Sequence, residues 1–167
     1  CDGGKNYTNG YAIQCYRLVA RYSEIYCSDS VITVGAYVEL SGYMEAENSH
    51  IIIGGAVASG IRFQSSPVVN PVLHNVTMNF RTATTITGSG VLNELRLVKD
   101  DTPARSIDIE GGTTLDIYTL FHDGNSTEET IITSSDTNAF TLDIKTLELY
   151  SDYLDLSYCT QAGGTFY

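Results

Sequence analysis

From residue 31 onward, apolar and polar residues alternate with a period of two. The pattern is clear in several separated segments, at Val76, Met78 and Phe80, at Ile107 and Ile109, at Leu115 and Ile117, and at Phe140, Leu142 and Ile144. Successive side chains of a strand point to opposite sides, so the pattern predicts strands with one buried and one solvent-exposed face. Burial on one side is typical of antiparallel sheets. We therefore expect a mainly β protein, an antiparallel β-sandwich or jelly roll of roughly ten strands over residues 31–159.

A recurring glycine motif leaves a second architecture open. Glycine separates two apolar pieces in ITVGAYV (32–38), IIIGGAV (51–57), TITGSGVL (85–92) and IDIEGGTTL (107–115). Glycine at such positions permits a sharp bend or a bulge. Solenoid repeats are usually more regular than the unequal spacing of these four glycine motifs. Corners between the sheets of a sandwich are our first interpretation, and a β-solenoid is the alternative.

The chain before residue 31 has a different pattern. Residues 1–10 are rich in glycine and asparagine and are expected to form an irregular arm. In residues 11–26 both the polar and the apolar positions recur at spacings of three and four, which predicts one amphipathic helix. With a tail at 160–167, these segments make a single domain over residues 1–167.

The four cysteines indicate a compartment and constrain the fold. They are Cys1, Cys15, Cys27 and Cys159, and the numbering begins without an initiator methionine, as in a processed secreted chain. An even number in such a chain predicts two disulfides and an extracellular location. A helix over 11–26 would hold Cys15 and Cys27 about 18 Å apart, too far to be bonded. The remaining pairings are Cys1–Cys15 with Cys27–Cys159, or Cys1–Cys27 with Cys15–Cys159.

Charge is distributed unevenly along the chain. Residues 1–105 hold eight Lys or Arg and nine Asp or Glu, whereas residues 106–167 hold one lysine and eleven carboxylates. So acidic a half repels phosphate, and we therefore expect no nucleic-acid partner. No apolar run approaches the roughly 20 residues that a membrane span requires.

Two kinds of site are candidates in this acidic chain. Sequons for N-glycosylation begin at Asn6, Asn75 and Asn125. Carboxylates at Asp108, Glu110 and Asp123 are candidates for a calcium site. Like charges that face each other across strands are destabilising, and a bound cation or a partner's lysines and arginines would relieve that repulsion. We expect no other cofactor.

The sequence contains none of the catalytic motifs that we sought, such as G-x-S-x-G or H-E-x-x-H. We therefore expect a non-enzymatic, extracellular structural or storage glycoprotein that assembles with itself or with homologous subunits into an oligomer or filament. The twelve tyrosines suit interfaces and ligand-facing surfaces. The alternative is a secreted binding module, lectin-like or a carrier of a small hydrophobic ligand.

Overall fold

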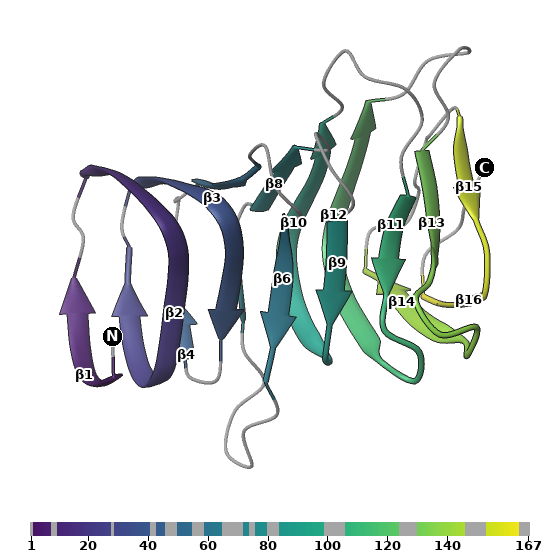
Figure 1. Ribbon diagram of the computed structural model, residues 1–167, viewed down its shortest axis with the longest axis horizontal. Helices are drawn as coiled ribbons and strands as arrows, with labels where there is room; N and C mark the ends of the chain where they lie inside the picture. The colour runs from purple at the N-terminus through teal and green to yellow at the C-terminus, as the bar shows by residue number, and fades with distance from the viewer. Residues whose placement is uncertain are drawn as a thin grey trace.

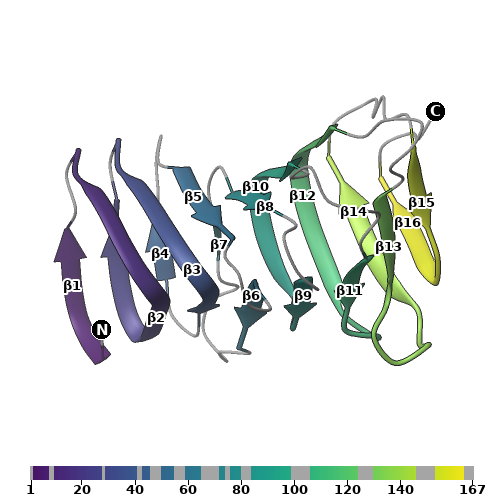
Figure 2. The same cartoon turned by 45° about the horizontal axis from the view of Figure 1, so that its top comes forward.

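The protein is a parallel β-solenoid (Figure 1). The computed structural model describes residues 2–7, 10–27, 29–40, 43–45, 50–54, 59–64, 72–73, 76–79, 84–98, 106–123, 130–145 and 153–163. These residues form sixteen strands in one continuous parallel ladder. The chain winds along one long axis, with β1 at one end and β15 and β16 at the other (Figure 2). Within the described residues, no helix has the length and apolar character needed to cross a membrane.

Each turn contributes to three faces, which the chain visits in the order face 1, face 2, face 3. Face 1 contains the first halves of β2 (Ala12–Tyr26) and β3 (Val31–Leu40), then β5 (His50–Ile53), β8 (Val76–Asn79) and the second halves of β10 (Gly90–Val98) and β12 (Thr114–Asp123). Face 2 contains the middle of β2, the second half of β3, β6 (Ser59–Phe63), β9 (Thr84–Thr87), β11 (Ser106–Ile109), β13 (Thr130–Ser134) and β15 (Leu154–Leu156). Face 3 contains β1 (Asp2–Tyr7), the end of β2, β4 (Tyr43–Glu45), β7 (Val72–Leu73), the first halves of β10 and β12, β14 (Phe140–Ile144) and β16 (Cys159–Ala162).

The turns of the solenoid differ in length. Ala12, Val31 and His50 are successive partners on face 1, and the two intervals between them are equal and short. Some later turns are longer, such as those from Ile51 to Val76 and from Leu95 to Leu120, whereas the interval from Val76 to Leu95 again equals the first two. Connections between strands account for the difference: residues 99–105 and 124–129 separate strands of face 1 from strands of face 2, and residues 64–71 separate β6 on face 2 from β7 on face 3.

The core consists of rows of apolar side chains that run along the axis. On face 1, one row of successive partners is Ile32, Ile51, Val76, Leu95 and Leu120, and on face 2 another is Val38, Ile61, Ile86 and Ile109. Each of these side chains is at most 5% exposed. Full burial of one such side chain stabilises the fold by roughly 1.5–3 kcal/mol.

Short corners between face 2 and face 3 use left-handed backbone. One such residue occurs at the corner in four successive turns, at Gly88 (φ +75°), Gly112 (φ +75°), Thr137 (φ +67°) and Tyr158 (φ +58°). At position 88 glycine is also required by space, since a Cβ atom there would lie 1.8 Å from the carbonyl oxygen of Phe63 in the preceding turn.

The predicted antiparallel sandwich or jelly roll is wrong, and the alternative, a β-solenoid, is correct. Every strand pairing in the described residues is parallel. Alternation did not distinguish the two architectures, because each turn of a solenoid wraps around its own core and leaves one side of every strand in water. A parallel sheet in a solenoid therefore shows the alternation that is otherwise typical of antiparallel sheets.

The spacing of the glycines concealed the repeat because the four glycine motifs lie at two different corners of the solenoid. Gly35 and Gly54 lie one turn apart at the corner between face 1 and face 2, where Gly54 N donates to Val34 O at 3.1 Å. Gly88 and Gly111 lie one turn apart at the corner between face 2 and face 3. The first and last intervals between the glycine motifs are thus single turns, and the long interval from Gly54 to Gly88 connects different corners.

The helix predicted over residues 11–26 is also wrong, because these residues form β2. This strand passes over all three faces, and each bend changes which residues point inward. Ile13, Cys15 and Leu18 pack against the core, at intervals of two and three. Bends of this kind imitate a helical period. The expected arm at residues 1–10 contains strand β1, and β16 includes the first residues of the expected tail.

Candidate functional site

The cysteines do not form the predicted bridges. Both predicted pairings join Cys159 to Cys15 or Cys27, but Cys15 lies in β2 and Cys159 in β16, at opposite ends of the solenoid (Figure 1). Five successive pairings lead from Cys15 only as far as His122, which at about 4.8 Å per strand is about 24 Å. Disulfide Cα atoms lie within about 7 Å of each other.

Cys15 and Cys159 are not in disulfides, and the side chains of both are half-buried. Burial raises the pKa of both, although a hydrogen bond with the backbone of Leu142 lowers that of Cys159. Cys27 is buried, and Cys1 is outside the described residues. The disulfide argument for an oxidising compartment therefore no longer holds.

The three calcium candidates lie on different parts of the solenoid. Asp108 is in β11 on face 2, and Asp123 ends β12 on face 1. Glu110 instead supports the corner of the preceding turn, because its Oε2 accepts a hydrogen bond from Gly88 N at 2.8 Å. Among the described residues, no three His, Cys, Asp or Glu side chains are grouped as a metal site would need.

One pair of facing carboxylates is neutralised within the chain. Asp116 and Asp143 are partners on face 3. The ammonium of Lys145 bonds to Asp143 and lies 3.7 Å from Asp116. The hydrogen bond to Asp143, followed by the field of Asp116, raises the pKa of Lys145. The single lysine of the acidic half thus relieves the repulsion between Asp116 and Asp143, a facing pair that the sequence analysis had not identified.

The sequons remain predictions. Asn6 lies in β1, where it pairs with Ile25, and Asn75 and Asn125 are outside the described residues.

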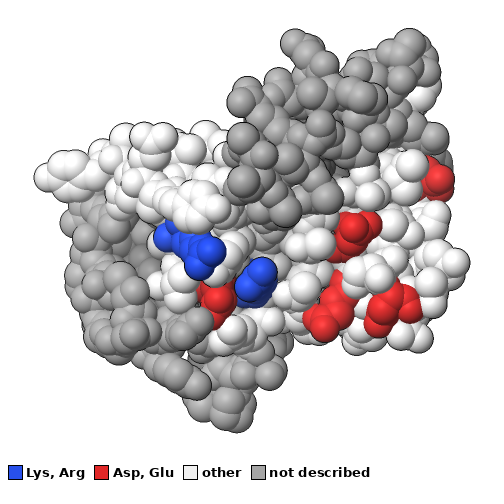
Figure 3. Space-filling view, in the orientation of Figure 1, with Lys and Arg blue, Asp and Glu red and all other residues white. Residues whose placement is uncertain are grey.

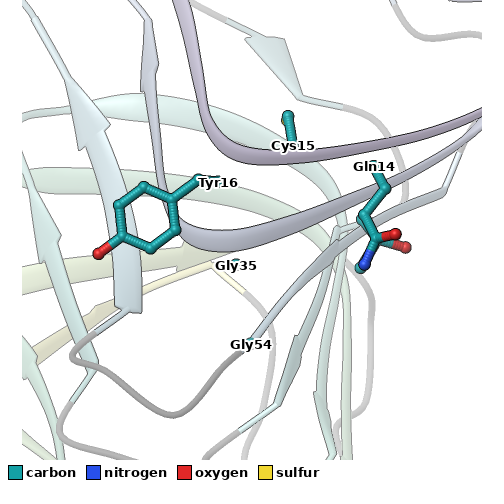
Figure 4. A pocket seen from close by; sticks show the side chains of 6 residues that line it. Gln14, Cys15, Tyr16, Gly35 and Gly54 are labelled. Atoms are coloured by element: carbon teal, nitrogen blue, oxygen red, sulfur yellow. The ribbon is translucent and has the colours of Figure 1, made fainter.

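A hollow of about 420 Å³ is present at the corner between face 1 and face 2, lined by Gln14, Cys15, Tyr16, Thr33, Gly35 and Gly54 (Figure 4). Its shape follows from a β-bulge. Cys15 pairs with Val34 and Arg17 with Tyr37, so Tyr16 alone faces two residues of β3. Those two residues are Gly35 and Ala36.

Glycine keeps the floor of this hollow open. Gly35 and Gly54 occupy the same corner in consecutive turns and carry no side chain, and a Cβ at position 35 would lie 3.6 Å from the Tyr16 ring. Tyr16 is 60% exposed and Gln14 is also exposed. Gln14 and Tyr16 extend to the same side of β2, with Cys15 on the other side (Figure 4). The lining thus combines the Tyr16 ring with the amide of Gln14 and the hydroxyl of its ladder partner Thr33, and the ring and the amide lie apart along β2 (Figure 4).

A cationic and aromatic cluster on face 2 adjoins the hollow at Tyr16. The Arg17 guanidinium lies 5.5 Å from the centre of the Tyr16 ring and 4.8 Å from that of Tyr37. The Arg62 guanidinium lies 4.2 Å from the Tyr37 ring centre. Tyr37 is therefore contacted by two cations, which attract the face of an aromatic ring.

Sequence reasoning did not find this site, because Gln14, Cys15 and Tyr16 fall inside the predicted helix. The available signal was the interval between Gly35 and Gly54, which equals one turn of the solenoid. No family model, curated protein or solved structure matches this chain.

Proposed function

We propose that the protein is a non-enzymatic, lectin-like binding module that holds a saccharide in the hollow beside Tyr16. The observation that carries this proposal is the exposed Tyr16 ring next to a floor of two stacked glycines. A sugar ring has a face of C–H groups and a rim of hydroxyls. The C–H face suits the tyrosine ring, and the hydroxyls suit the Gln14 amide and the Thr33 hydroxyl.

The size and composition of the site support this class of ligand. A volume of about 420 Å³ is within the usual range for small-ligand sites. The lining combines one aromatic ring with a few polar groups, as such sites commonly do. Extracellular glycans are the partners that we propose, and the extracellular location is part of the same proposal.

A glycan array with the purified, labelled protein tests the proposal, followed by titration calorimetry with each saccharide that binds. Tyr16→Ala removes the ring, and we expect affinity to fall at least tenfold. Tyr118→Ala is the matched control, because Tyr118 is also an exposed tyrosine of a strand, 51% exposed in β12 and outside the hollow. An array without binding, or equal affinities of the two variants, would contradict the proposal.

Assembly with further copies is a second candidate function, favoured by the charges on face 2. Figure 3 shows two groups of blue side chains with one red group beside them over the half that contains β3 and β6, and only red side chains over the half that contains β11 and β13. Opposite ends of two copies could attract each other in a heterologous contact. Sedimentation velocity at low and at high salt tests this, and a monomer under both conditions would exclude it.

A further inference from the structure

We propose that the saccharide is anionic, and that Arg17 and Arg62 bind its carboxylate or sulfate while Tyr16 holds its ring. This inference rests on the proposed function and specifies the ligand class of the same site. It starts from the contact of both guanidiniums with Tyr37, 4.8 Å and 4.2 Å from that ring centre. Arg17 in β2 and Arg62 in β6 come from the two strands that flank Tyr37 in β3, so an anionic group between the two guanidiniums, at the rim of this ring, would contact both.

Both guanidiniums are available to a ligand. Arg17 and Arg62 are exposed, and neither forms an ion pair with a carboxylate in the described part of the chain. A cation–π contact uses the attraction between the positive charge and the ring, and it needs no carboxylate. The N–H groups of a guanidinium match a carboxylate or a sulfate in pairs, which is the strongest form of such a hydrogen bond.

One carboxylate offsets part of this charge. Glu39 is the partner of Arg62 across the ladder, and it is 4% exposed. Its Oε1 accepts a hydrogen bond from Gln64 Nε2 at 2.8 Å. Among the side chains that the structure describes, two guanidiniums and one buried carboxylate thus lie next to the hollow, a net of one positive charge.

Arg96 shows that an arginine on a ring need not be available to a ligand. Its guanidinium lies 4.2 Å from the centre of the Phe121 ring, as close as Arg62 lies to Tyr37. However, Arg96 Nε bonds to Glu94 Oε1 at 2.5 Å, so its charge is neutralised. Arg96 is therefore a natural internal control for the Arg17 and Arg62 pair.

The rest of face 2 limits how far an anionic ligand extends. Asp108, Glu110, Asp136 and Asp155 lie on or beside its strands further along the axis (Figure 3). They would repel a polyanion that runs along the face. We therefore expect a short acidic oligosaccharide, with an affinity that no longer rises once the chain exceeds a few sugars.

The test compares trigalacturonate, neutral galactotriose and a heparin tetrasaccharide by titration calorimetry at low and at moderate salt. We expect at least one acidic probe to bind tenfold or more tightly than the neutral one, and its affinity to fall with salt. The comparison of uronate with sulfate identifies the anionic group. Arg17→Gln and Arg62→Gln should each weaken that binding about tenfold, whereas Arg96→Gln should leave it unchanged.

Each of the following outcomes would overturn the inference, and the first two would leave the proposed function intact. Neutral and acidic sugars could bind equally well with Tyr16 still required, which would remove the role of the arginines. Arg96→Gln could weaken binding as much as Arg17→Gln, which would indicate unspecific attraction. Inorganic sulfate could displace the acidic sugar at equal concentration, which would show that the site binds an anion and makes no use of the ring. Near-identical circular dichroism spectra check that each variant is folded.

Discussion

Replacing Gly88 by alanine tests how tightly the turns of the solenoid are stacked, and Gly112→Ala is its matched control. Both glycines have φ +75° at the same kind of corner. A Cβ atom at position 112 meets nothing within 4 Å, whereas one at position 88 would lie 1.8 Å from Phe63 O. The two variants therefore share the backbone strain and differ in the steric overlap.

The magnitude follows from this difference. The left-handed conformation costs a residue with a Cβ about 1–2 kcal/mol, and alanine recovers some of this by restricting the unfolded chain. We expect Gly112→Ala to destabilise the fold by about 1 kcal/mol. In Gly88→Ala, the corner must also move away from β6, which sacrifices packing and ladder hydrogen bonds. At about 1 kcal/mol per bond and 1–3 kcal/mol for overpacking, the additional loss is about 3 kcal/mol.

Urea unfolding measures both variants, with circular dichroism and tyrosine fluorescence as signals, since the chain has twelve tyrosines and no tryptophan. Gly88→Ala should have the lower midpoint by far, or fail to fold where Gly112→Ala folds. If the two free energies of unfolding differed by less than about 1 kcal/mol, the close contact between turns would be refuted.

Three further predictions concern the core, the corners and the charges. Ile86→Ala should cost about 2–5 kcal/mol in urea unfolding, because Ile86 is 1% exposed between two other isoleucines of its row. Asp136 accepts hydrogen bonds from its neighbours Asn138 and Ser134, which lower its pKa, so its contribution to stability is complete above the pKa of about 4 of an unfolded aspartate and is lost at lower pH. Asp136→Asn should therefore be less stable near neutral pH and lose less stability than the wild type on acidification, in unfolding curves between pH 5 and 2. Lys145→Gln should lower the melting temperature, and added salt should restore part of it by screening the facing carboxylates.

Each of these has a clear contrary result. A cost below about 1 kcal/mol for Ile86→Ala would contradict a closely packed row. Parallel acid-unfolding curves of Asp136→Asn and the wild type would show that this carboxylate is not stabilised by the corner. A salt-independent melting temperature difference for Lys145→Gln would remove the electrostatic explanation.

From residue 31 onward, many of the strands and their inward sides were predictable from the sequence. Met78, Ile107 and Leu142 were expected to be buried by alternation, and each is at most 1% exposed. The direction of the strands was not predictable from alternation, because it shows which side of a strand is buried and not which neighbour the strand pairs with. The repeat that relates Ala12, Val31 and His50 was visible only in part, since longer corners interrupt it in later turns.

The site was harder to predict than the strands. Tyr16, an exposed residue at a bend, had no distinguishing pattern, and the bend itself produced the spacing that suggested a helix. Likewise, Cys159 was expected to bond Cys15 or Cys27, from the even number of cysteines and the predicted helix, although a solenoid places residues that are far apart in the sequence far apart in space. The position of each residue along the axis became known only with the ladder.

The corner between face 1 and face 2 accommodates segments of very different length. Tyr16 alone occupies it in β2, two residues occupy it in β3, and residues 99–105 and 124–129 separate the strands there in later turns. The rows of core residues remain in register despite these differences, because each strand is aligned by its neighbours in the ladder. We therefore expect this edge to tolerate inserted residues without loss of the fold. A peptide tag or a second binding loop inserted there would lie on the same edge as the hollow. The number of strands between the insertion and the hollow would set the distance between them.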